Sequence, residues 1–152
     1  MNINVRNANI NDLDKGLLDA YIQGYRYHQN GRPDIFDNVP DETLKENLLK
    51  DFDNFSFIVV CDNDTVIGYL AYLIKNNKVK KLKLEQLIIS EKYRGHGLGK
   101  MLIEKAKAIA IENHCKRIEL DCWTFNKNAL DMYEHVGFNK QRILFEMPLN
   151  TD

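Results

Sequence analysis

The sequence lacks the features that mark membrane, secreted or nucleic-acid-binding proteins. No apolar run approaches the roughly 20 residues that span a bilayer. The polar start, MNINVRNANINDLDKG, has neither the basic nor the apolar region of a signal peptide. Acidic and basic residues nearly balance, with a formal net charge of −1, which argues against a broad nucleic-acid or anionic-membrane surface. We therefore expect a cytoplasmic protein with no nucleic-acid or membrane partner.

Cysteine is also scarce. The sequence has three cysteines and no C-x-x-C pair, and an odd set of this kind is typical of free thiols in a reducing compartment. The four histidines show no pairing that suggests metal ligands. The sequence therefore predicts neither a disulfide framework nor a metal site.

Internal repeats, low-complexity tracts and linkers rich in proline or glycine are absent as well. A length of 152 residues fits one ordinary domain that can bury a core without disulfides or metals. We expect a single domain over residues 1–152.

Hydrophobic periodicity predicts an α/β fold, a three-layer arrangement with a mixed central sheet and helices on both faces. Asn11 is expected to cap the first helix, with Asp12 and Asp14 in its first turn. Short connections join three consecutive central strands, which dictates an antiparallel meander before a helical crossover. The strands are predicted at 2–6, 55–61, 65–74, 79–90, 117–123 and 141–149, and helices begin near residues 11, 41, 97 and 126.

The stretch of residues 93–101, YRGHGLGKM, lies between a predicted strand and a predicted helix. Glycines allow successive backbone amides to turn inward around an anion, at the positive end of the helix dipole. A tight strand-to-helix turn is the simpler alternative, but three glycines exceed what a turn requires. The stretch predicts a pyrophosphate-binding loop.

Two nucleotide loops fit this stretch less well. A Walker A loop needs four residues between its glycines and a hydroxyl after the lysine, but Gly95 and Gly99 are separated by three residues and Met101 follows Lys100. In the dinucleotide fingerprint G-x-G-x-x-G, Lys100 stands where the third glycine is required. Too few residues follow the loop for the further βαβ units of that fold. A dinucleotide-dependent oxidoreductase fragment is therefore disfavoured.

Two motifs together resemble the GNAT superfamily of acyl-CoA-dependent N-acyltransferases. Residues 94–99, RGHGLG, match the signature Arg/Gln-x-x-Gly-x-Gly/Ala. Residues 123–138, WTFNKNALDMYEHVGF, resemble the family's W-x-x-N-x-x-A-x-x-x-Y-x-x-x-G-F segment. The resemblance runs from about residue 55 to the end of the chain and implies the GNAT fold.

The resemblance also implies the chemistry, which is transfer of an acetyl group from acetyl-CoA, a cosubstrate, to a primary amine by direct attack in a ternary complex. A bulge in the strand before the loop is expected to open a slot for the pantetheine arm. Glu85 matches a catalytic glutamate, direct or through water, and Tyr133 matches the general acid. The implied coenzyme-binding residues are Leu87, Ile88, Ile89, Arg94, Gly95, His96, Gly97, Leu98, Gly99, Lys100, Asn126 and Tyr133.

The acceptor is a small-molecule or peptide amine by the same resemblance. His28, Arg32, Asp34 and Phe36 resemble a pattern in related sequences and are candidate acceptor-binding residues. Non-functional alternatives stay open for each candidate. The acidic region around these four residues can be a solvated helix face, and Glu85 can be a solvent-facing strand carboxylate. Tyr133 can be a core aromatic residue, and Asn126 can be a helix cap. A non-catalytic acyl-CoA sensor is the alternative function, and a homodimer is plausible from the family.

Overall fold

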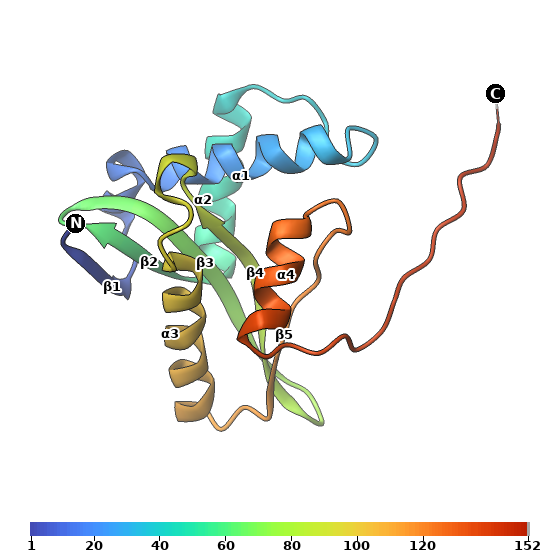
Figure 1. The fold of residues 1–152 in the computed structure, drawn as a ribbon. Coiled ribbons are helices and arrows are strands. Elements are labelled where there is room, and N and C mark those ends of the chain that lie inside the picture. Colours follow the sequence, from blue (N-terminus) through green and yellow to red (C-terminus); the bar gives the residue numbers. More distant parts are fainter. Residues whose placement is uncertain (152) are drawn as a thin grey trace. The chain divides into compact units, whose positions relative to one another are not determined.

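The computed structural model describes residues 1–151, and the chain divides into two compact units, Met1–Asp121 and Cys122–Asp152 (Figure 1). The first unit holds a five-stranded sheet in the order β1-β2-β3-β4-β5. Neighbours β1 to β4 pair antiparallel, and β5 pairs parallel to β4. The predicted meander and mixed sheet are confirmed. The strands are β1 (Ile3–Asn7), β2 (Ser56–Asp62), β3 (Thr65–Asn76), β4 (Lys80–Ile89) and β5 (Arg117–Glu119).

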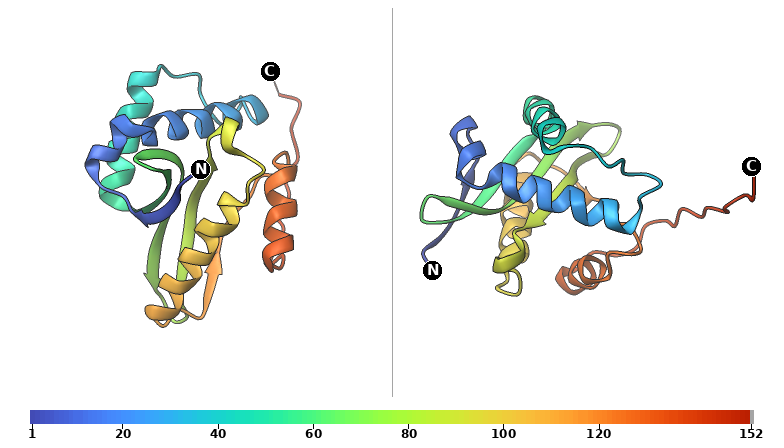
Figure 2. Two further views of the ribbon diagram at one scale, coloured as in Figure 1. Left: turned by 60° about the vertical axis from the view of Figure 1, so that its left-hand side comes forward. Right: turned by 90° about the horizontal axis from the view of Figure 1, so that it is seen from above.

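Helices cover both faces of this sheet. Helices α1 (Leu17–Gly31) and α2 (Asp41–Asn54) pack on one face, and α3 (Leu98–Glu112) packs on the other. Figure 2 shows α2 and α3 on opposite sides of the strands. Each face has its own hydrophobic core, because alternate residues of β2 and β3 point to opposite sides. Among residues 1–151, no helix combines the length and apolarity needed to cross a membrane.

The first helical segment begins earlier than Asn11. A 3-10 helix, η1 (Ile10–Lys15), is capped by Asn9, whose side chain accepts from the Asn11 amide at 3.0 Å. Gly16, at φ +120°, then separates η1 from α1. The prediction that Asn11 caps a continuous helix was therefore wrong. A side chain added at Gly16 would meet the Val66 carbonyl oxygen, so the two helical segments are joined by a turn that only glycine fits.

Asp12 lies in η1 and is buried, with an ion pair to β1. Its side chain is 2% exposed and receives two hydrogen bonds from the Arg6 guanidinium, at 2.8 and 2.9 Å. The Asn9 amide donates to the same carboxylate at 2.8 Å. The hydrogen bonds from Arg6 hold the pKa of Asp12 below its ordinary value, despite burial. This pair fastens η1 to the edge strand.

The second unit contains one helix, α4 (Lys127–Val136), which ends at Gly137 in the left-handed conformation as predicted. The strand predicted at 141–149 does not form: within the described residues this segment has no regular secondary structure and no strand partner. Its apolar side chains are exposed, for example 86% for Phe145. The alternating pattern indicates a strand, but a strand also needs a neighbour for its backbone groups. Pro148 further removes one donor.

Candidate functional site

The glycine stretch forms a loop that leads from 3-10 helix η2 (Glu91–Tyr93) into α3. Gly95 has φ +83° and Gly97 has φ +74°, and a Cβ built at either position meets no atom within 4 Å. Packing therefore does not demand glycine, whereas the left-handed backbone does. Among residues 1–151, none of the amides of 95–100 donates to an acceptor of the chain. This leaves a set of N–H groups without an acceptor of the described chain at the start of α3.

Such an arrangement suits a diphosphate. Consecutive free amides at a helix N-terminus point their dipoles at one place, where a charge of about +0.5 from the helix adds to the attraction. Loop residues 94–97 are exposed, so a ligand can reach these amides. The loop therefore fits the predicted coenzyme-binding role.

A β-bulge lies in β4 at Glu85. In the register with β3, Gln86 pairs with Ala71 and Leu84 pairs with Tyr72, so Glu85 has no partner. The bulge reverses the pleat: Leu84 lies in the α3 core, and Gln86 faces the α1 and α2 side. The side chain of Glu85 is exposed at this point. The bulge expected from the resemblance is thus present, with the candidate base at its centre.

The strands β4 and β5 separate just before the bulge. Their parallel pairing covers only Lys81–Lys83 with Arg117–Glu119, shorter than the predicted strand 117–123. Beyond Lys83, β4 continues to Ile89, and this part of the strand has β3 as its neighbour but no pairing with β5. The residues 87–89 therefore run along a sheet edge on the β5 side, where backbone groups are available to a ligand arm. Ile88 packs its side chain toward α1, against Gly24.

The candidate acid and Asn126 lie in the second unit. Tyr133, on α4, is half-buried and contacts the Phe138 ring at 5.6 Å, edge to face. Burial, with a smaller contribution from Cys122, raises the pKa of the Tyr133 phenol above its ordinary value. A phenol of this kind stays protonated at neutral pH and can donate. The Asn126 side chain makes no capping hydrogen bond to α4, so capping does not account for its presence.

Cys122 is not activated as a nucleophile. Burial raises the pKa of its thiol, which disfavours the thiolate. Its sulfur lies 3.6 Å from the Trp123 carbonyl oxygen. Disfavoured ionisation argues against a covalent acyl-cysteine route.

The four candidate acceptor residues fall into two pairs at the C-terminal end of α1, which contains His28, and in the segment that follows it. The rings of His28 and Phe36 lie 5.5 Å apart. Arg32 and Asp34 form a two-pronged ion pair with each other, with N–O distances of 2.8 and 2.9 Å. Each charge of this second pair is largely neutralised by the other. Both pairs stay candidate contacts for an acceptor.

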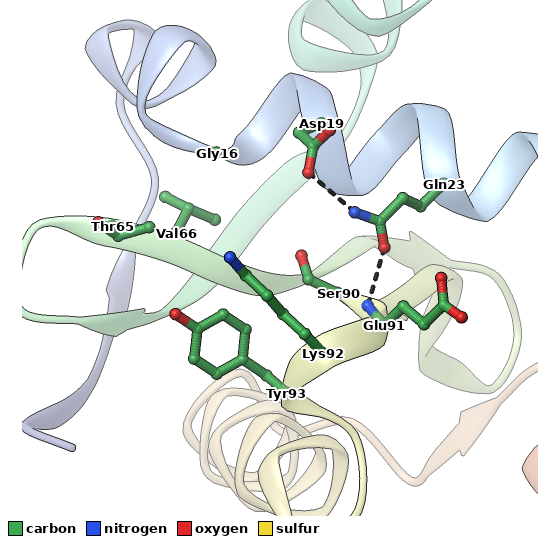
Figure 3. Close-up of a pocket in the computed structure, with 9 residues that line it drawn as sticks. All are labelled: Gly16, Asp19, Gln23, Thr65, Val66, Ser90, Glu91, Lys92 and Tyr93. Atoms are coloured by element: carbon green, nitrogen blue, oxygen red, sulfur yellow. Dashed lines mark hydrogen bonds between the residues drawn. The ribbon is translucent and has the colours of Figure 1, made fainter.

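A hollow of about 520 Å³ lies beside the segment that enters the glycine loop (Figure 3). It is lined by α1, the start of β3 and η2, and none of the predicted site residues borders it. Within it, Gln23 accepts a hydrogen bond from the Glu91 amide at 2.8 Å and donates to Asp19 (Figure 3). The hollow thus marks a contact between α1 and η2 rather than the predicted slot.

Sequence reasoning missed the residues that tie α1 to the loop. One of them is Gln23, which accepts from the Glu91 amide. The other is Tyr27, whose ring centroid lies 5.9 Å from the guanidinium carbon of Arg94. The Nε of Arg94 also donates a hydrogen bond to the Ile89 carbonyl at 3.1 Å. Arg94 is thereby folded back toward α1 and β4. The contacts of Gln23 with Glu91 and of Tyr27 with Arg94 join residues more than sixty positions apart, so no local sequence pattern predicts them.

The sequence matches the Acetyltransferase (GNAT) family over residues 20–138. The chain is similar to N-alpha-acetyltransferase 30 of Saccharomyces cerevisiae, 38% identical over 142 residues, covering 91% of this chain and 71% of that protein. It is 36% identical to human N-alpha-acetyltransferase 30 over 104 residues, 68% of this chain but 29% of the relative. Bovine thialysine N-epsilon-acetyltransferase is 31% identical over 74 residues, 47% of this chain and 44% of the relative. The chain therefore spans less than half of the latter two relatives.

Solved structures share the fold. A tetramutant of the BH1408 protein from Bacillus halodurans has a TM-score of 0.83 at 21% identity, covering 96% of this chain and 99% of that one. An aminoglycoside N-acetyltransferase in complex with CoA has a TM-score of 0.74 at 17% identity, covering 96% and 94%. Fold, loop and bulge agree with the sequence match, and the chain belongs to the GNAT family of acetyltransferases.

Proposed function

We propose that this chain is an acetyl-CoA-dependent N-acetyltransferase acting on a primary amine of a small molecule or peptide, by direct attack in a ternary complex. The observation that carries the proposal is the set of N–H groups of residues 95–100, which have no acceptor within the described chain and lie at the start of α3. Charge-assisted hydrogen bonds to such groups contribute about 1.5–3 kcal/mol each. Several of them hold a diphosphate firmly.

The amine must lose a proton to attack the thioester carbonyl. A lysine-like amine has a pKa of about 10.4, so its deprotonation at pH 7 costs about 4.6 kcal/mol. A peptide α-amine, with a pKa near 7.7–8.0, costs only about 1.0–1.4 kcal/mol. Glu85 is the proposed base, directly or through water, because the bulge presents its carboxylate to solvent at the end of the β4–β5 pairing.

Collapse of the tetrahedral intermediate breaks the carbon–sulfur bond, and the departing sulfur takes up a proton. Tyr133 is the proposed donor. Its raised pKa keeps the phenol protonated, and no hydrogen bond of its hydroxyl is found within residues 1–151. A single domain over residues 1–152 is part of the proposal.

For the acceptor, we propose a peptide α-amine first and a small amine second. The relative matched over 91% of this chain is named as an N-alpha-acetyltransferase, whereas the thialysine enzyme is matched over 47%. Deprotonation of a peptide α-amine by an exposed base also costs less free energy than deprotonation of an ε-amine. His28 and Phe36 are the proposed contacts for the acceptor's first side chain.

The test is an acceptor screen with acetyl-CoA, measuring released thiol with peptides of varied N-terminus and with lysine-like amines. We expect turnover with at least one peptide. Glu85→Gln should lower kcat by about 10²- to 10⁴-fold if the carboxylate acts as base. Tyr133→Phe should lower kcat with little change in acetyl-CoA affinity, since it keeps the ring and removes only the hydroxyl.

Two results would contradict the proposal. Tight acetyl-CoA binding without turnover across the panel would support the non-catalytic sensor instead. Absence of measurable CoA affinity by calorimetry would remove the basis of both functions. The cytoplasmic location and the homodimer remain predictions, and light scattering after size-exclusion chromatography measures the second.

A further inference from the structure

A hydrogen-bonded cluster joins four elements beside the bulge. The Asp51 carboxylate, on α2, accepts from the Tyr21 hydroxyl of α1 and from the Gln86 side-chain amide of β4, both at 2.8 Å and both at Oδ2. The Gln86 carbonyl oxygen accepts from the Tyr69 hydroxyl of β3, also at 2.8 Å. We call these four residues the bulge cluster: Tyr21, Asp51, Tyr69 and Gln86.

Every member of the bulge cluster has a fixed role. Gln86 must turn its oxygen to a phenol and its nitrogen to a carboxylate, and only one orientation of the amide does both. Burial raises the pKa of both phenols, Tyr21 and Tyr69, so each remains a donor. Tyr69 is 1% exposed and contacts the rings of Tyr21 and Phe57. These polar groups can therefore satisfy all three hydrogen bonds in one arrangement only.

The position of Gln86 gives the cluster its significance. Gln86 directly follows Glu85, and the pleat of β4 reverses between Leu84 and Gln86. Leu84 is held in the α3 core, whereas Gln86 is held toward α1 and α2 by the cluster. The extra residue between these two anchors is Glu85. A slip of the bulge by one position would pull Gln86 from its partners, which would leave the buried Tyr69 hydroxyl unpaired and the partly buried Asp51 carboxylate with Tyr21 as its remaining cluster partner.

From this we propose that the bulge cluster is a positioning device: it fixes the bulge at Glu85 and thereby the direction in which that carboxylate leaves the strand. Asp51 is a positioning residue in this scheme and not a second base, because its Oδ2 already accepts two hydrogen bonds. The catalytic consequence rests on the proposed function of Glu85. The structural part, a bulge held by the cluster, does not.

The test compares wild type with Asp51→Asn, Tyr69→Phe and the control Ile103→Val. The control removes one buried methylene from α3, which destabilises the fold about as much as one lost hydrogen bond does, without touching the cluster. Hydrogen exchange of the apo protein is followed at the amides of residues 84–88. We expect exchange at least about tenfold faster in both cluster variants, and unchanged exchange there in the control, because only the cluster variants free the bulge to open locally.

Kinetics supply the second readout. Misplacing a reacting group by about 1 Å can cost about 10²-fold, so Asp51→Asn should lower kcat 10- to 100-fold while the KM for acetyl-CoA stays within a factor of three. Asp51→Glu, which keeps the carboxylate, should recover part of kcat. The control should keep its kcat at temperatures where it is folded.

The outcomes separate the two proposals. Unchanged exchange at 84–88 in both cluster variants would overturn the positioning proposal, whatever the activity. Faster exchange with kcat unchanged would overturn its catalytic consequence. A wild type that turns over no amine would overturn the proposed function, and the exchange data alone would then decide whether the cluster holds the bulge.

Discussion

The two faces of the sheet in the first unit differ in kind. The core under α3 is aliphatic: its buried residues are Ile58, Val60, Ile67, Leu70, Leu82, Leu84, Leu98, Leu102, Ala106 and Ala110. The core under α1 and α2 contains the buried aromatics Tyr21, Phe57 and Tyr69. It also borders Asp51 and the buried Asp12. One face is uniform, and the other mixes aromatic rings with hydrogen-bonded polar groups.

This difference shows how the fold divides its tasks. An aliphatic core needs only volume and shape, and it seats the helix whose N-terminus carries the free amides. Polar groups in the opposite core must find partners in specific orientations, which restricts the backbone around them. The aliphatic face therefore acts as a support, and the polar face sets the detailed geometry of β4.

The largest expected effect is on the aliphatic face. Leu102 is fully buried, so Leu102→Ala should lower the free energy of unfolding by about 3–5 kcal/mol through lost burial and a residual cavity. Met101→Ala, one position away and 39% exposed, should cost no more than about 1 kcal/mol. Urea denaturation of both variants measures the difference. Equal effects would mean that α3 is not packed as described.

A comparable loss of stability is expected when the buried Asp12 carboxylate on the polar face loses its partner. Arg6→Met leaves the Asp12 carboxylate buried without its guanidinium, and we expect a loss of about 3 kcal/mol, at the lower end for broken buried pairs because Arg6 is 38% exposed. The matched control is Lys107→Met, which breaks an ion pair exposed on both sides and should cost about 0.5 kcal/mol or less.

The Asp12 pair also predicts a pH dependence. Its pKa is lowered in the folded state, so its contribution is present above the unfolded value of about 3.9 and is lost as the pH falls below it. The difference in unfolding free energy between wild type and Arg6→Met should be full near pH 7 and shrink below about pH 4. A constant difference from pH 7 to pH 3 would show that Arg6 acts by packing alone.

A smaller effect is expected in the loop that α3 supports. Gly97→Ala places a Cβ at φ +74° and should cost about 1–2 kcal/mol of stability. Acetyl-CoA affinity should fall at least tenfold, about 1.4 kcal/mol, because the amides lose their inward turn. Gly137→Ala introduces a similar strain at the end of α4, at φ +112°, and should leave the affinity unchanged. Calorimetry decides between strain alone and a lost ligand contact.

The smallest effect is expected where β4 meets β5. Lys81 lies 2.9 Å from Glu119 across the parallel pair, and both side chains are about three-quarters buried or more (23% and 20% exposed). Lys81→Met should cost about 0.5–1 kcal/mol at low salt and less at 1 M salt, where screening is strong. A cost that does not change with salt would assign the effect to packing of the lysine stem.

Most of the sheet and every α-helix could be predicted from local periodicity, because apolar spacing fixes which face each element buries. The cap at Asn9 could not be predicted, because the ion pair between Arg6 and the buried Asp12 fixes where η1 begins, and this pair forms only in the folded chain. The segment 141–149 has the right alternation but its pairing depends on distant backbone. The bulge did leave a signal: leucines at 82 and 84 predict an apolar residue at 86, but that position is Gln86 and the apolar residues resume at 87–89.

In the candidate site, the glycine loop was the most predictable part, because the glycines that its left-handed backbone needs lie close together in the sequence. The free amides of 95–100 follow from it directly. The bulge cluster and the contact of Tyr27 with Arg94 could not be foreseen, because their members are brought together only by the tertiary fold.

The two-for-one pairing at Glu85 makes an unusual excision possible. Without residue 85, Leu84 and Gln86 would become neighbours in a regular antiparallel ladder, and each would keep its present partner on β3 and its present side of the sheet. A chain shortened by this one residue should therefore still fold, as circular dichroism and urea titration would report. It would, however, have a straight β4 without the irregularity at which β4 and β5 part, and we expect the two strands to pair further, across the edge proposed for the thioester arm.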